Sequence, residues 1–577
     1  MLIFFKKLLK KWPSRFQWEK LPSLLSKKER YFILALGILI IASLISWCIS
    51  YRAIHTIAIP DYGGSYTEGI VGSPQYINPI LCQTNDADQD ISELIFSGLI
   101  KYDSKGNLVP DLAERYAIGD EGKIYDFFLR KDVNWHDGEP FNADDVIFTI
   151  QTIQNSDYKS PLIFNWNGVE VEKIDDYAVR FKLKNAYAPF LNNTTIGILP
   201  KHIWENIFPP EFFLTEINLK PIGTGPYKFT KFEKDKKGSI KILHLKANEN
   251  YYLSNPFIKS IAFKFYVNEE TLISAYNKGE VKGLNSITAQ NKLLLKSYKR
   301  KLNIYQLKLP RYFAVFFNQS KSKALSDKIV RLALNYATNK QEIVDEILNG
   351  EGILINSPIP PGVFGYTSKT KIYDFALEHA NNLLDAAGWQ KNEETGIREK
   401  TLERNEEPTP LEITLLTTKY PELESVAGIL QEQWSKLGAK IEIKILGIAD
   451  IQQEYIRPRE YQALLFGEVL GTDPFPFWHS SQKRYPGLNL ALYHNSDVDN
   501  LLKDAHKAFD SEKRKEKYEE FQKLVVEDVP VVFLYNSFYL YPVSKKIKGI
   551  EIENISIPSK RFSGIENWYI KTKRVKK

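Results

Sequence analysis

Residues 128–146 read FLRKDVNWHDGEPFNADDV, and this short stretch predicts the end of a strand, a turn and the start of a helix. We expect the strand over Lys123–Arg130 and the turn at Asp137-Gly138, a pair typical of tight turns. Asn142 should be the N-cap of the helix, because an asparagine side chain at that position accepts a backbone N–H. The helix would bury one apolar face, formed by Val146, Ile147, Ile150 and Ile153.

The adjacent His136 and Asp137 of this stretch are more simply explained by a structural turn than by a metal site. Neighbouring side chains of an extended backbone point to opposite faces, so one metal ion would not easily hold both. His202 and Glu205 lack the second histidine of a zinc-protease helix, and Gly223–Pro226 lacks the lysine and the helix of a phosphate-binding loop. No Gly-x-Ser-x-Gly elbow occurs either. The sequence therefore predicts no catalytic residue, no metal site and no cofactor.

Helix and strand signals alternate along the rest of the chain, as in mixed α/β domains. Ser326 should open one helix, and Asn339 with Glu342 resembles a capping box that opens the next. A further helix is expected from Glu422 to a stop at Gly438. The strand that follows contains the alternating Ile441, Ile443 and Ile445.

Composition points to a folded protein of several domains whose excess of positive charge lies in the N-terminal segment. The chain has 577 residues, of which 43% are hydrophobic and 13% aromatic, so two or three domains with real cores are expected. The net charge is +7, but residues 1–30 contain nine of the 77 basic residues and only two of the 70 acidic ones. The remaining chain is neutral overall, which argues against a nucleic-acid partner.

Residues 31–51 form an uncharged apolar run that predicts a transmembrane helix. As a helix, these 21 residues would span about 31 Å, the thickness of a bilayer core. The bases before the run favour a cytoplasmic N-terminus, with the rest of the chain outside. A cleaved signal peptide and a lipoprotein signal are the alternatives, but Trp47 stands before Cys48, where a lipoprotein signal needs a small residue. We predict a basic cytoplasmic segment (1–30), an uncleaved anchor (31–51) and a tether (52–60).

Cys48 and Cys82 are the only cysteines, and the first lies in the apolar run. The part of the chain outside the membrane therefore has only one cysteine and cannot form an internal disulfide bond. We expect Cys82 to be a buried thiol and not a nucleophile or a metal ligand.

Residues 466–493 combine aromatic and polar side chains with three prolines and three glycines, so one regular element is not expected throughout. Loops of this composition suit the binding of small solutes, although a well-packed hinge loop would have the same composition. The relevant side chains are Glu468, Asp473, Phe475, Phe477, Trp478, His479, Tyr485, Asn489 and Tyr493.

From about Gly63 onward the sequence resembles the extracellular solute-binding proteins of family 5, which are the oligopeptide- and dipeptide-binding proteins of ABC importers. The stretch at 128–146 carries the most specific likeness. Supporting segments occur in the expected order at 69–79, 221–227, 331–337, 386–389 and 489–499.

This resemblance implies a two-lobed, periplasmic-binding-protein-like α/β fold of type II, similar to cluster C, after one N-terminal transmembrane helix. By resemblance, an extra domain is inserted early in the first lobe. Lobe I is placed at 61–91, 213–310 and 539–577, the inserted domain at 92–212, and lobe II at 311–538. Such proteins close over a ligand about a hinge, and the closed form docks on the importer's membrane subunits.

The sequence departs from the family at one ligand-binding position. In peptide-binding relatives, an aspartate four residues before the proline of a late loop pairs with the ligand's α-ammonium, whereas Leu470 stands four residues before Pro474. We hypothesise that Glu468 takes this role, since a buried ammonium needs a charged partner. Asp473, and Glu68 beside the glycines of the opening strand, are the other candidates. The full set of predicted ligand-binding residues is Glu68, Gly69, Tyr312, Glu468, Asp473, Trp478, Asn489 and Tyr493.

The resemblance thus implies a monomeric, membrane-anchored, extracytoplasmic binding protein that delivers peptides to permease subunits. Its partners would be a small solute, the permease and the membrane, without nucleic acid. Oligosaccharides, haem or metal chelates are alternative ligands for the same fold. A tethered extracellular hydrolase would need a nucleophile–base pair or metal set, and a surface adhesin would favour repeats; the sequence indicates neither.

Overall fold

The computed structural model describes residues 15–296, 298–402, 407–471 and 473–577. The chain divides into two compact units, one reaching to Tyr62 and including Lys571–Lys577, the other Gly63–Ile570. The predicted basic segment lies partly outside the described residues, because residues 1–14 are not among them.

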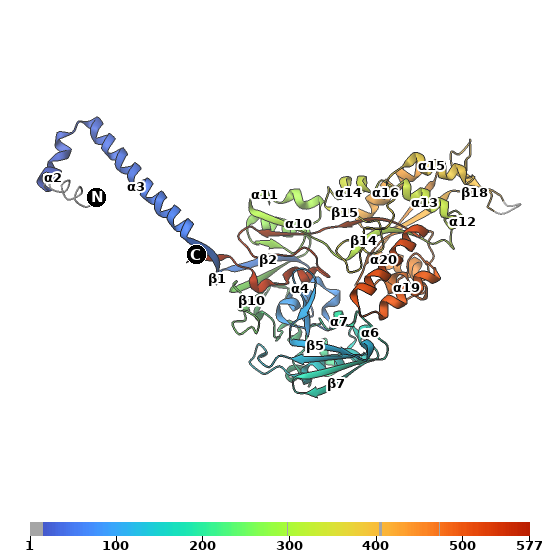
Figure 1. Cartoon of the computed structure of the whole chain (residues 1–577), viewed down its shortest axis with the longest axis horizontal. Helices are drawn as coiled ribbons and strands as arrows, with labels where there is room; N and C mark the ends of the chain where they lie inside the picture. Colours follow the sequence, from blue (N-terminus) through green and yellow to red (C-terminus); the bar gives the residue numbers. More distant parts are fainter. Residues whose placement is uncertain (1–14, 297, 403–406, 472) are drawn as a thin grey trace. The chain divides into compact units, whose positions relative to one another are not determined.

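The first unit consists of two helices and a two-stranded ribbon, which can be followed in Figure 1. Helix α2 is Arg15–Leu24 and helix α3 is Lys27–His55. The Ser26 side chain accepts the Glu29 N–H while the Glu29 carboxylate accepts the Ser26 N–H, so a capping box starts α3. By length and composition α3 is able to cross a membrane, with a mean hydropathy of 2.7, and none of its residues is buried.

Strand β1 (Thr56–Asp61) follows α3 directly and pairs antiparallel with β24 (Lys571–Lys576). The predicted tether, residues 52–60, comprises the last turn of α3 and most of β1. The backbone of β24 supplies the hydrogen-bond partners that turn this segment into a strand.

In the second unit, a seven-stranded sheet, called sheet I, has the order β13-β23-β12-β2-β11-β10-β9. Strand β2 lies between β11 and β12 and runs parallel to both. Along β11, Ile261, Phe263 and Phe265 are buried at alternate positions, as expected for a strand with one face toward a core. The strand bounds are β2 Ser65–Val71, β9 Tyr227–Lys234, β10 Ile240–Ala247, β11 Ser260–Tyr266, β12 Gly283–Leu284, β13 Leu302–Leu307 and β23 Tyr539–Ser544.

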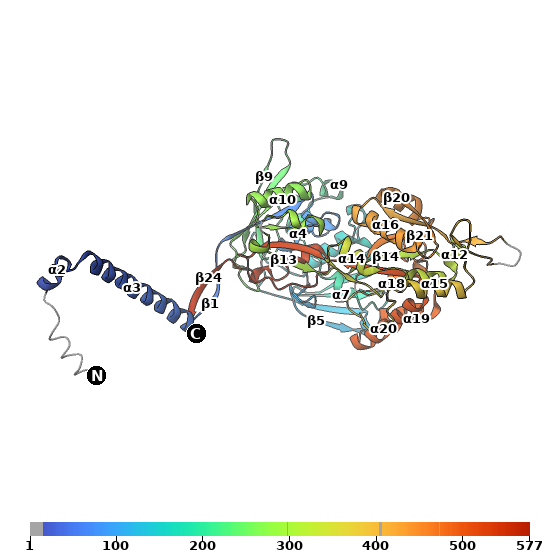
Figure 2. The ribbon, with the colours of Figure 1, turned by 90° about the horizontal axis from the view of Figure 1, so that it is seen from above.

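A six-stranded sheet, called sheet II, has the order β15-β22-β14-β21-β19-β20. Buried apolar clusters lie on both of its faces, so the inner strands β14 and β22 are nearly continuous apolar runs, whereas the edge strand β20 alternates. Figure 2 shows α16 on one side of β21 and α19 with α20 on the other. The strand bounds are β14 Arg311–Phe317, β15 Gly352–Leu354, β19 Glu412–Thr418, β20 Lys440–Leu446, β21 Ala463–Val469 and β22 Val531–Ser537.

A four-stranded antiparallel sheet, called sheet III, has the order β5-β6-β8-β7 and is inserted between β2 and β9 in the sequence. Its core is continuous with that of sheet I. The strands are β5 Ala113–Gly119, β6 Ile124–Leu129, β7 Val169–Asp175 and β8 Ala178–Leu183. The small strands outside the three sheets are β3 Ile100–Tyr102, β4 Leu108–Pro110, β16 Gln390–Lys391, β17 Arg398–Lys400 and β18 Thr409–Pro410.

The helices around sheets I and III are α4 Asp86–Ile95, α5 Ala143–Gln154, α6 Ile163–Trp166, α7 Phe190–Asn193, α8 Lys201–Trp204, α9 Pro209–Phe212, α10 Glu269–Lys278 and α11 Tyr298–Lys301. Those around sheet II are α12 Lys323–Ser326, α13 Lys328–Tyr336, α14 Lys340–Glu346, α15 Leu377–Ala386, α16 Pro421–Ser435, α17 Ile448–Asp450, α18 Phe475–Trp478, α19 Ser496–Lys507 and α20 Ser511–Asp528.

The local predictions around residues 128–146 are confirmed. The predicted strand is β6, and Asn142 caps α5 in a capping box with Asp145. The turn docks on the backbone of a second turn, where the His136 N–H donates to the Gly223 carbonyl at 2.9 Å and the Gly223 N–H donates to His136 Nδ1 at 3.3 Å. Burial lowers the pKa of His136 to about 4, so the ring is neutral. This histidine therefore has a structural role.

A glycine is required at position 223 because α4 approaches it closely. A Cβ atom there would lie 1.9 Å from the carbonyl oxygen of Ile95. The Gly225 N–H donates to the same oxygen at 2.7 Å, which satisfies a carbonyl at the end of α4. The GTGP sequence is thus a close backbone contact and not a phosphate loop.

Two connections join sheet I to sheet II. Residues 308–310 link β13 to β14, and Phe538 alone links β22 to β23. The Asn536 amide donates to the Leu309 carbonyl at 2.8 Å, and the Arg311 guanidinium donates to Ser537 Oγ at 3.1 Å. These hydrogen bonds place the two connections next to each other.

Candidate ligand-binding cleft

A cavity of about 630 Å³ lies where segments from the two large sheets meet beside residues 308–310, and it is called the cleft. This volume is within the range of ligand pockets in proteins. One wall consists of residues outside or at the ends of the strands of sheet II, at 361–364, 469–471, 473, 476–477 and 488. The other comprises parts of 102–106 and 187–195 together with 554–563.

Two extended segments flank the connection at 308–310 and shape the cleft. The Leu470 N–H donates to the Pro310 carbonyl at 2.6 Å, which fixes the chain just after β21. On the other side, the Ile555 N–H donates to the Lys308 carbonyl at 3.0 Å. The cleft therefore has extended backbone on two walls, an arrangement suited to a ligand that itself has an extended main chain.

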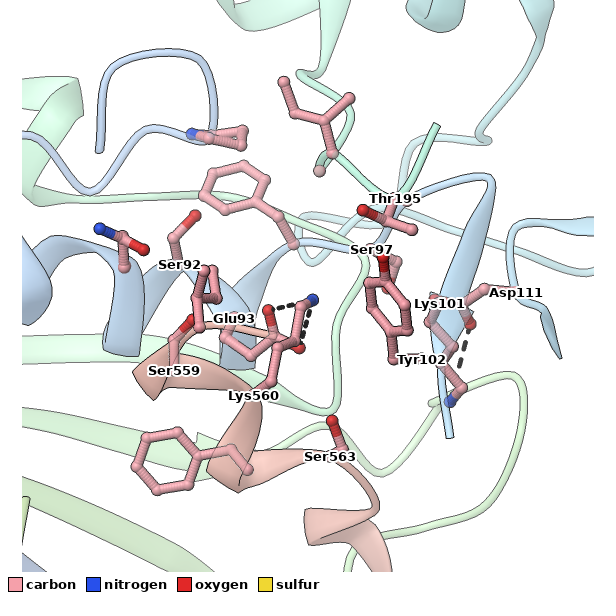
Figure 3. Close-up of a pocket in the computed structure, with 18 of the residues that line it drawn as sticks. Ser92, Glu93, Ser97, Lys101, Tyr102, Asp111, Thr195, Ser559, Lys560 and Ser563 are labelled. Carbon is pink, nitrogen blue, oxygen red and sulfur yellow. Dashed lines mark hydrogen bonds and ion pairs between the residues drawn. The ribbon is translucent and has the colours of Figure 1, made fainter. Parts of the chain in front are cut away.

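A smaller cavity of about 260 Å³, called the inner pocket, shares eight lining residues with the cleft, including Tyr102, Thr195 and Lys560. Figure 3 shows Ser92 and Glu93 entering the inner pocket from α4, and Ser559 and Lys560 from the short helix η8 (Pro558–Phe562). The shared residues make the inner pocket a side chamber of the cleft.

The inner pocket contains charges of both signs. Lys560 Nζ lies 2.7 Å from Glu93 Oε2, and the two side chains point toward each other in Figure 3. Lys101 Nζ lies 3.9 Å from Asp111 Oδ1, which also accepts the Tyr252 hydroxyl at 2.6 Å. Burial raises the pKa of Asp111 to about 6. Such paired charges are able to exchange partners with the charged ends of a ligand.

Each chamber also contains a buried amide oxygen that accepts no hydrogen bond within the described residues. These are Gln83 Oε1 in the inner pocket and Asn554 Oδ1 in the cleft. Leaving a buried acceptor unpaired costs about 1–3 kcal/mol, so a ligand N–H placed there would be favourable. Neither residue is predicted from the sequence, because a single asparagine or glutamine carries no pattern.

Sheet III touches the helices beside sheet II through Phe509, which lies between α19 and α20. A Cβ atom at Gly122 would lie 1.9 Å from the Phe509 ring, and φ at Gly122 is +85°, so only glycine fits there. The Ala188 N–H donates to the His506 carbonyl at 3.2 Å, and the Tyr187 and His506 rings lie 4.7 Å apart. These contacts bridge the two sides at the margin of the cleft.

Of the eight predicted ligand-binding residues, Asp473 alone lines the cleft. Its Oδ1 accepts the Phe475 N–H at 3.0 Å, and its Oδ2 lies 2.9 Å from His506 Nδ1. Asp473 thus joins the start of α18 to the contacts with sheet III.

Glu468 and Tyr312 lie together inside the core of sheet II. The Tyr312 hydroxyl donates to Glu468 Oε2 at 2.5 Å, and Glu468 Oε1 accepts no hydrogen bond within the described residues. Burial raises the pKa of Glu468 to about 8, so the carboxyl group is mostly neutral at pH 7. A neutral, enclosed acid is poorly suited to hold a ligand ammonium.

The other residues predicted in the late loop organise that loop. The Asn489 amide donates to the Tyr493 carbonyl at 3.0 Å and accepts the Tyr493 N–H at 3.1 Å. The Tyr493 hydroxyl donates to Asp528 at 2.6 Å, and Trp478 is 1% exposed in the same apolar cluster. The structure therefore places these side chains in packing contacts, and their contact with a ligand stays a prediction.

Glu68 and Gly69 lie on β2 inside the core around sheet I. Glu68 is fully buried and pairs with Arg561, while Gly69 packs against Leu272. Neither residue lines the cleft or the inner pocket. Cys82 is buried as predicted, and burial raises the pKa of its thiol to about 12.

The model of the bacterial extracellular solute-binding proteins, family 5 (middle), matches residues 107–484, which is more than half of the chain. The chain belongs to this family. Members of this family are substrate-binding proteins of ABC transporters and not enzymes. The predicted family and the predicted two-lobed α/β fold class are confirmed.

Two proteins illustrate the range of relatives. The oligopeptide-binding protein AppA of Bacillus subtilis is 29% identical over 560 residues, covering 94% of this chain and 99% of AppA. Its structure in complex with a nonapeptide has a TM-score of 0.67 at 28% identity, covering 89% of this chain and 100% of that one. NikZ from Campylobacter jejuni in complex with Ni(L-His) has a TM-score of 0.68 at 29% identity, covering 88% and 99%.

Proposed function

We propose that this family 5 protein is the membrane-anchored receptor of an ABC importer, that it binds peptides in the cleft and that it passes them to the permease. The observation that carries the proposal is the cleft itself, bounded by backbone segments from both large sheets at their connection. Two relatives support peptides as the ligand: the AppA structure contains a nonapeptide, and a dipeptide-binding protein of Escherichia coli is 27% identical over 526 residues, covering 84% of this chain and 93% of that protein.

Main-chain recognition would make the receptor tolerant of peptide sequence. The extended segments at 469–471 and 554–557 would bind the peptide N–H and C=O groups, as in strand addition. Asn554 Oδ1 would accept one of the peptide N–H groups. Side chains of the peptide would then occupy the apolar parts of the cleft near Leu309, Phe364 and Phe477.

The charged peptide ends would be held by groups at the two chambers. Lys560 would pair with a terminal carboxylate in the inner pocket, in exchange for part of its contact with Glu93. Asp473 is our candidate for the terminal ammonium, because it faces the cleft whereas Glu468 does not. An ammonium taken out of water needs such a partner.

The domain limits also belong to this proposal. Lobe I would comprise 61–91, 213–310 and 539–577, the inserted domain 92–212 and lobe II 311–538. Sheets I, III and II fall in these three regions respectively, whereas residues 571–577 pair with β1 in the first unit. The lobes would rotate about residues 308–310 and Phe538, and closure would be stabilised by the bound peptide.

Helix α3 would hold a monomeric receptor in the membrane, with its binding unit outside the cell. Tethering raises the effective concentration of the receptor near a permease in the same membrane. Carbonate extraction of cells at high pH tests this part, and the full-length protein should remain with the membranes. Release of full-length protein in soluble form would contradict the anchor.

The binding site is tested by filling the cleft. A Cβ atom placed on Gly471 would meet no atom within 4 Å, so a larger residue there would extend into the cleft without disturbing the core. We expect Gly471→Trp to abolish peptide binding in calorimetry. Gly428→Trp on the exposed side of α16, where a Cβ also meets no atom within 4 Å, is the matched control and should bind normally.

The same titrations distinguish peptides from the alternative ligands of this fold. Peptide mixtures, oligosaccharides and metal–amino acid chelates are added in turn to the full-length protein in detergent. Binding of a sugar or a chelate that Gly471→Trp abolishes, without peptide binding, would keep the cleft and reject the peptide assignment.

A further inference from the structure

The first unit contains a positively charged surface that the binding of peptides does not use. We call it the basic ribbon, and it consists of β1, β24 and Lys577. The two strands are in register from Thr56 opposite Lys576 to Asp61 opposite Lys571. Five of its last seven residues are basic and exposed, namely Lys571, Lys573, Arg574, Lys576 and Lys577.

The ribbon has little internal neutralisation. Asp61 is its one acidic residue, and Asp61 Oδ1 lies 3.5 Å from Lys573 Nζ. The carboxylate thus offsets one base and leaves the others to interact with an external anion. Residues 31–577, which include the ribbon, are neutral overall, so this concentration of positive charge is local.

The ribbon is fixed to the end of α3. The Lys577 N–H donates to the His55 carbonyl at 3.1 Å. The Arg574 guanidinium donates to the Arg52 carbonyl at 3.2 Å and to Thr56 Oγ1 at 2.8 Å. These hydrogen bonds cap carbonyl groups at the last turn of the apolar helix, so the bases lie beside the point where that helix would leave a bilayer.

One face of the ribbon is suited to a membrane interface. Residues directly opposite in an antiparallel pair share a face, so Ile57 lies beside Val575, and Ile59 beside Lys573. Ile57 is 45% exposed. Lysines next to exposed aliphatic residues bury their stems along apolar surface while their ammonium groups stay in the polar layer. Within the first unit, β1 and β24 have no third strand among the described residues. Because a two-stranded ribbon alone is only marginally stable in water, contact with a membrane surface would stabilise it.

We propose that the basic ribbon binds the anionic headgroups of the phospholipids around α3, at the outer surface of the membrane. This inference rests on the anchoring part of the proposed function. Lys and Arg side chains are attracted to a negatively charged bilayer when they lie within about a Debye length of its surface. The ribbon follows α3 directly, and this connection keeps its bases within that distance. The proposed ligand is thus the headgroup layer of lipids with a net negative charge, and not a protein.

The test uses the full-length protein in nanodiscs of neutral phosphatidylcholine, with or without anionic phosphatidylglycerol. Hydrogen–deuterium exchange is measured for peptides that cover residues 56–61 and 571–577. We expect exchange there to be about tenfold slower with the anionic lipid in low salt, and the difference to disappear in high salt. Exchange elsewhere in the binding unit should be the same in both lipids.

Two variants make the result specific. Replacing Lys571, Lys573, Lys576 and Lys577 by glutamine keeps Arg574 at the helix end and should remove the lipid-dependent protection. Replacing Lys231, Lys234, Lys236 and Lys237, exposed lysines of β9 and the turn that follows it, removes the same number of charges and should leave the protection unchanged.

The contrary outcomes separate the ribbon from the anchor. The ribbon proposal is overturned if exchange does not depend on lipid charge, or if both variants lose the protection equally. In either case the protein would still sediment with carbonate-washed membranes. Protection that arises only after permease subunits are added overturns the lipid assignment in favour of a protein contact. Loss of the protein from washed membranes would instead overturn the anchoring itself.

Discussion

The Arg561 guanidinium lies 2.6 Å from Glu68 Oε1, although 493 residues separate the two in the sequence, and both side chains are fully buried. The same guanidinium reaches Asp90 Oδ2 at 2.6 Å. The hydroxyls of Tyr66 and Tyr541 donate to the other Glu68 oxygen at 2.6 and 2.7 Å. This network ties β2, α4 and β23 to the segment that returns at η8.

Glu68→Gln is expected to destabilise the protein without changing its ligand specificity. Removing one partner of a buried ion pair leaves charge uncompensated, at a cost of about 3–5 kcal/mol. Denaturant unfolding should show this loss, while Glu114→Gln on exposed β5 should stay within about 0.5 kcal/mol of wild type. An unchanged stability, or a selective loss of peptide affinity, would restore the prediction that Glu68 contacts the ligand.

Glu468 should make stability depend on pH. Its pKa is raised by burial from the ordinary value of 4.5 to about 8, so the folded protein keeps a proton that the unfolded chain has released over that range. Unfolding therefore releases a proton between about pH 4.5 and pH 8, and stability falls as the pH rises through this window. Arg459 and the Tyr312 hydroxyl oppose the shift but do not cancel it.

Glu468→Gln should remove this dependence, because glutamine stays neutral and still accepts the Tyr312 hydroxyl. Relative to wild type, the variant is expected to gain stability from pH 5 to pH 8, as followed by denaturant unfolding at each pH. Its affinity for peptides with a free N-terminus should change less than twofold. A well-folded variant that binds such peptides at least tenfold more weakly would support the original hypothesis that Glu468 anchors the amine.

Sequence patterns predicted the local structure well because the causes are local. Asn142 caps α5 through its own side chain, and Gly438 ends the α16 region with a φ of +80°, a conformation that glycine adopts at little cost. The arrangement of the sheets in two lobes was predicted from the family resemblance and not from local patterns. The two-residue offset between Ser326, where a helix was expected to open, and α13 at Lys328 reflects a separate short helix, α12.

The binding residues were harder to predict because the cleft is assembled from distant segments. The walls come from residues near 102, 195, 309, 363, 470 and 555, and no sequence period connects them. Trp478 and Tyr493 are predicted as ligand contacts from the composition of their loop, and the structure places both in packing contacts, because aromatic residues fill a core equally well. The sequence gives no sign that the Glu68 carboxylate is already paired, because its partner Arg561 is distant in the sequence.

Lys560→Gln should weaken binding in a way that depends on the peptide carboxylate. We expect at least a tenfold loss, about 1.4 kcal/mol, for peptides with a free C-terminus and a smaller loss for amidated peptides. Lys436→Gln is a matched control, because it removes a lysine that pairs with Glu432 at 3.0 Å on the surface. Calorimetry measures the affinity of each variant for both peptide types. Equal losses of affinity for the two types would show that Lys560 does not bind the peptide carboxylate.

Phe509→Ala should favour the open form of the receptor. The ring fills the space above Gly122 and lies 6.4 Å from the Tyr125 ring, so its removal loses apolar contact between sheet III and the helices of sheet II. Peptide affinity should fall about tenfold, since binding would first have to supply the closure energy. Small-angle scattering of the ligand-free variant should give a larger radius of gyration.

The control for this prediction is Phe208→Ala, which removes a phenylalanine that is 68% exposed. It should change neither affinity nor scattering. An unchanged affinity in Phe509→Ala would show that the contact with Gly122 does not contribute to closure.

The most direct test of the peptide-receptor account is to identify what the full-length protein carries when it is purified gently in detergent. Native mass spectrometry followed by ligand release and fragmentation should yield a heterogeneous set of short peptides, and Gly471→Trp should yield none. A single sugar or metal chelate, or a protein that stays empty in the presence of peptide mixtures, would contradict the peptide assignment.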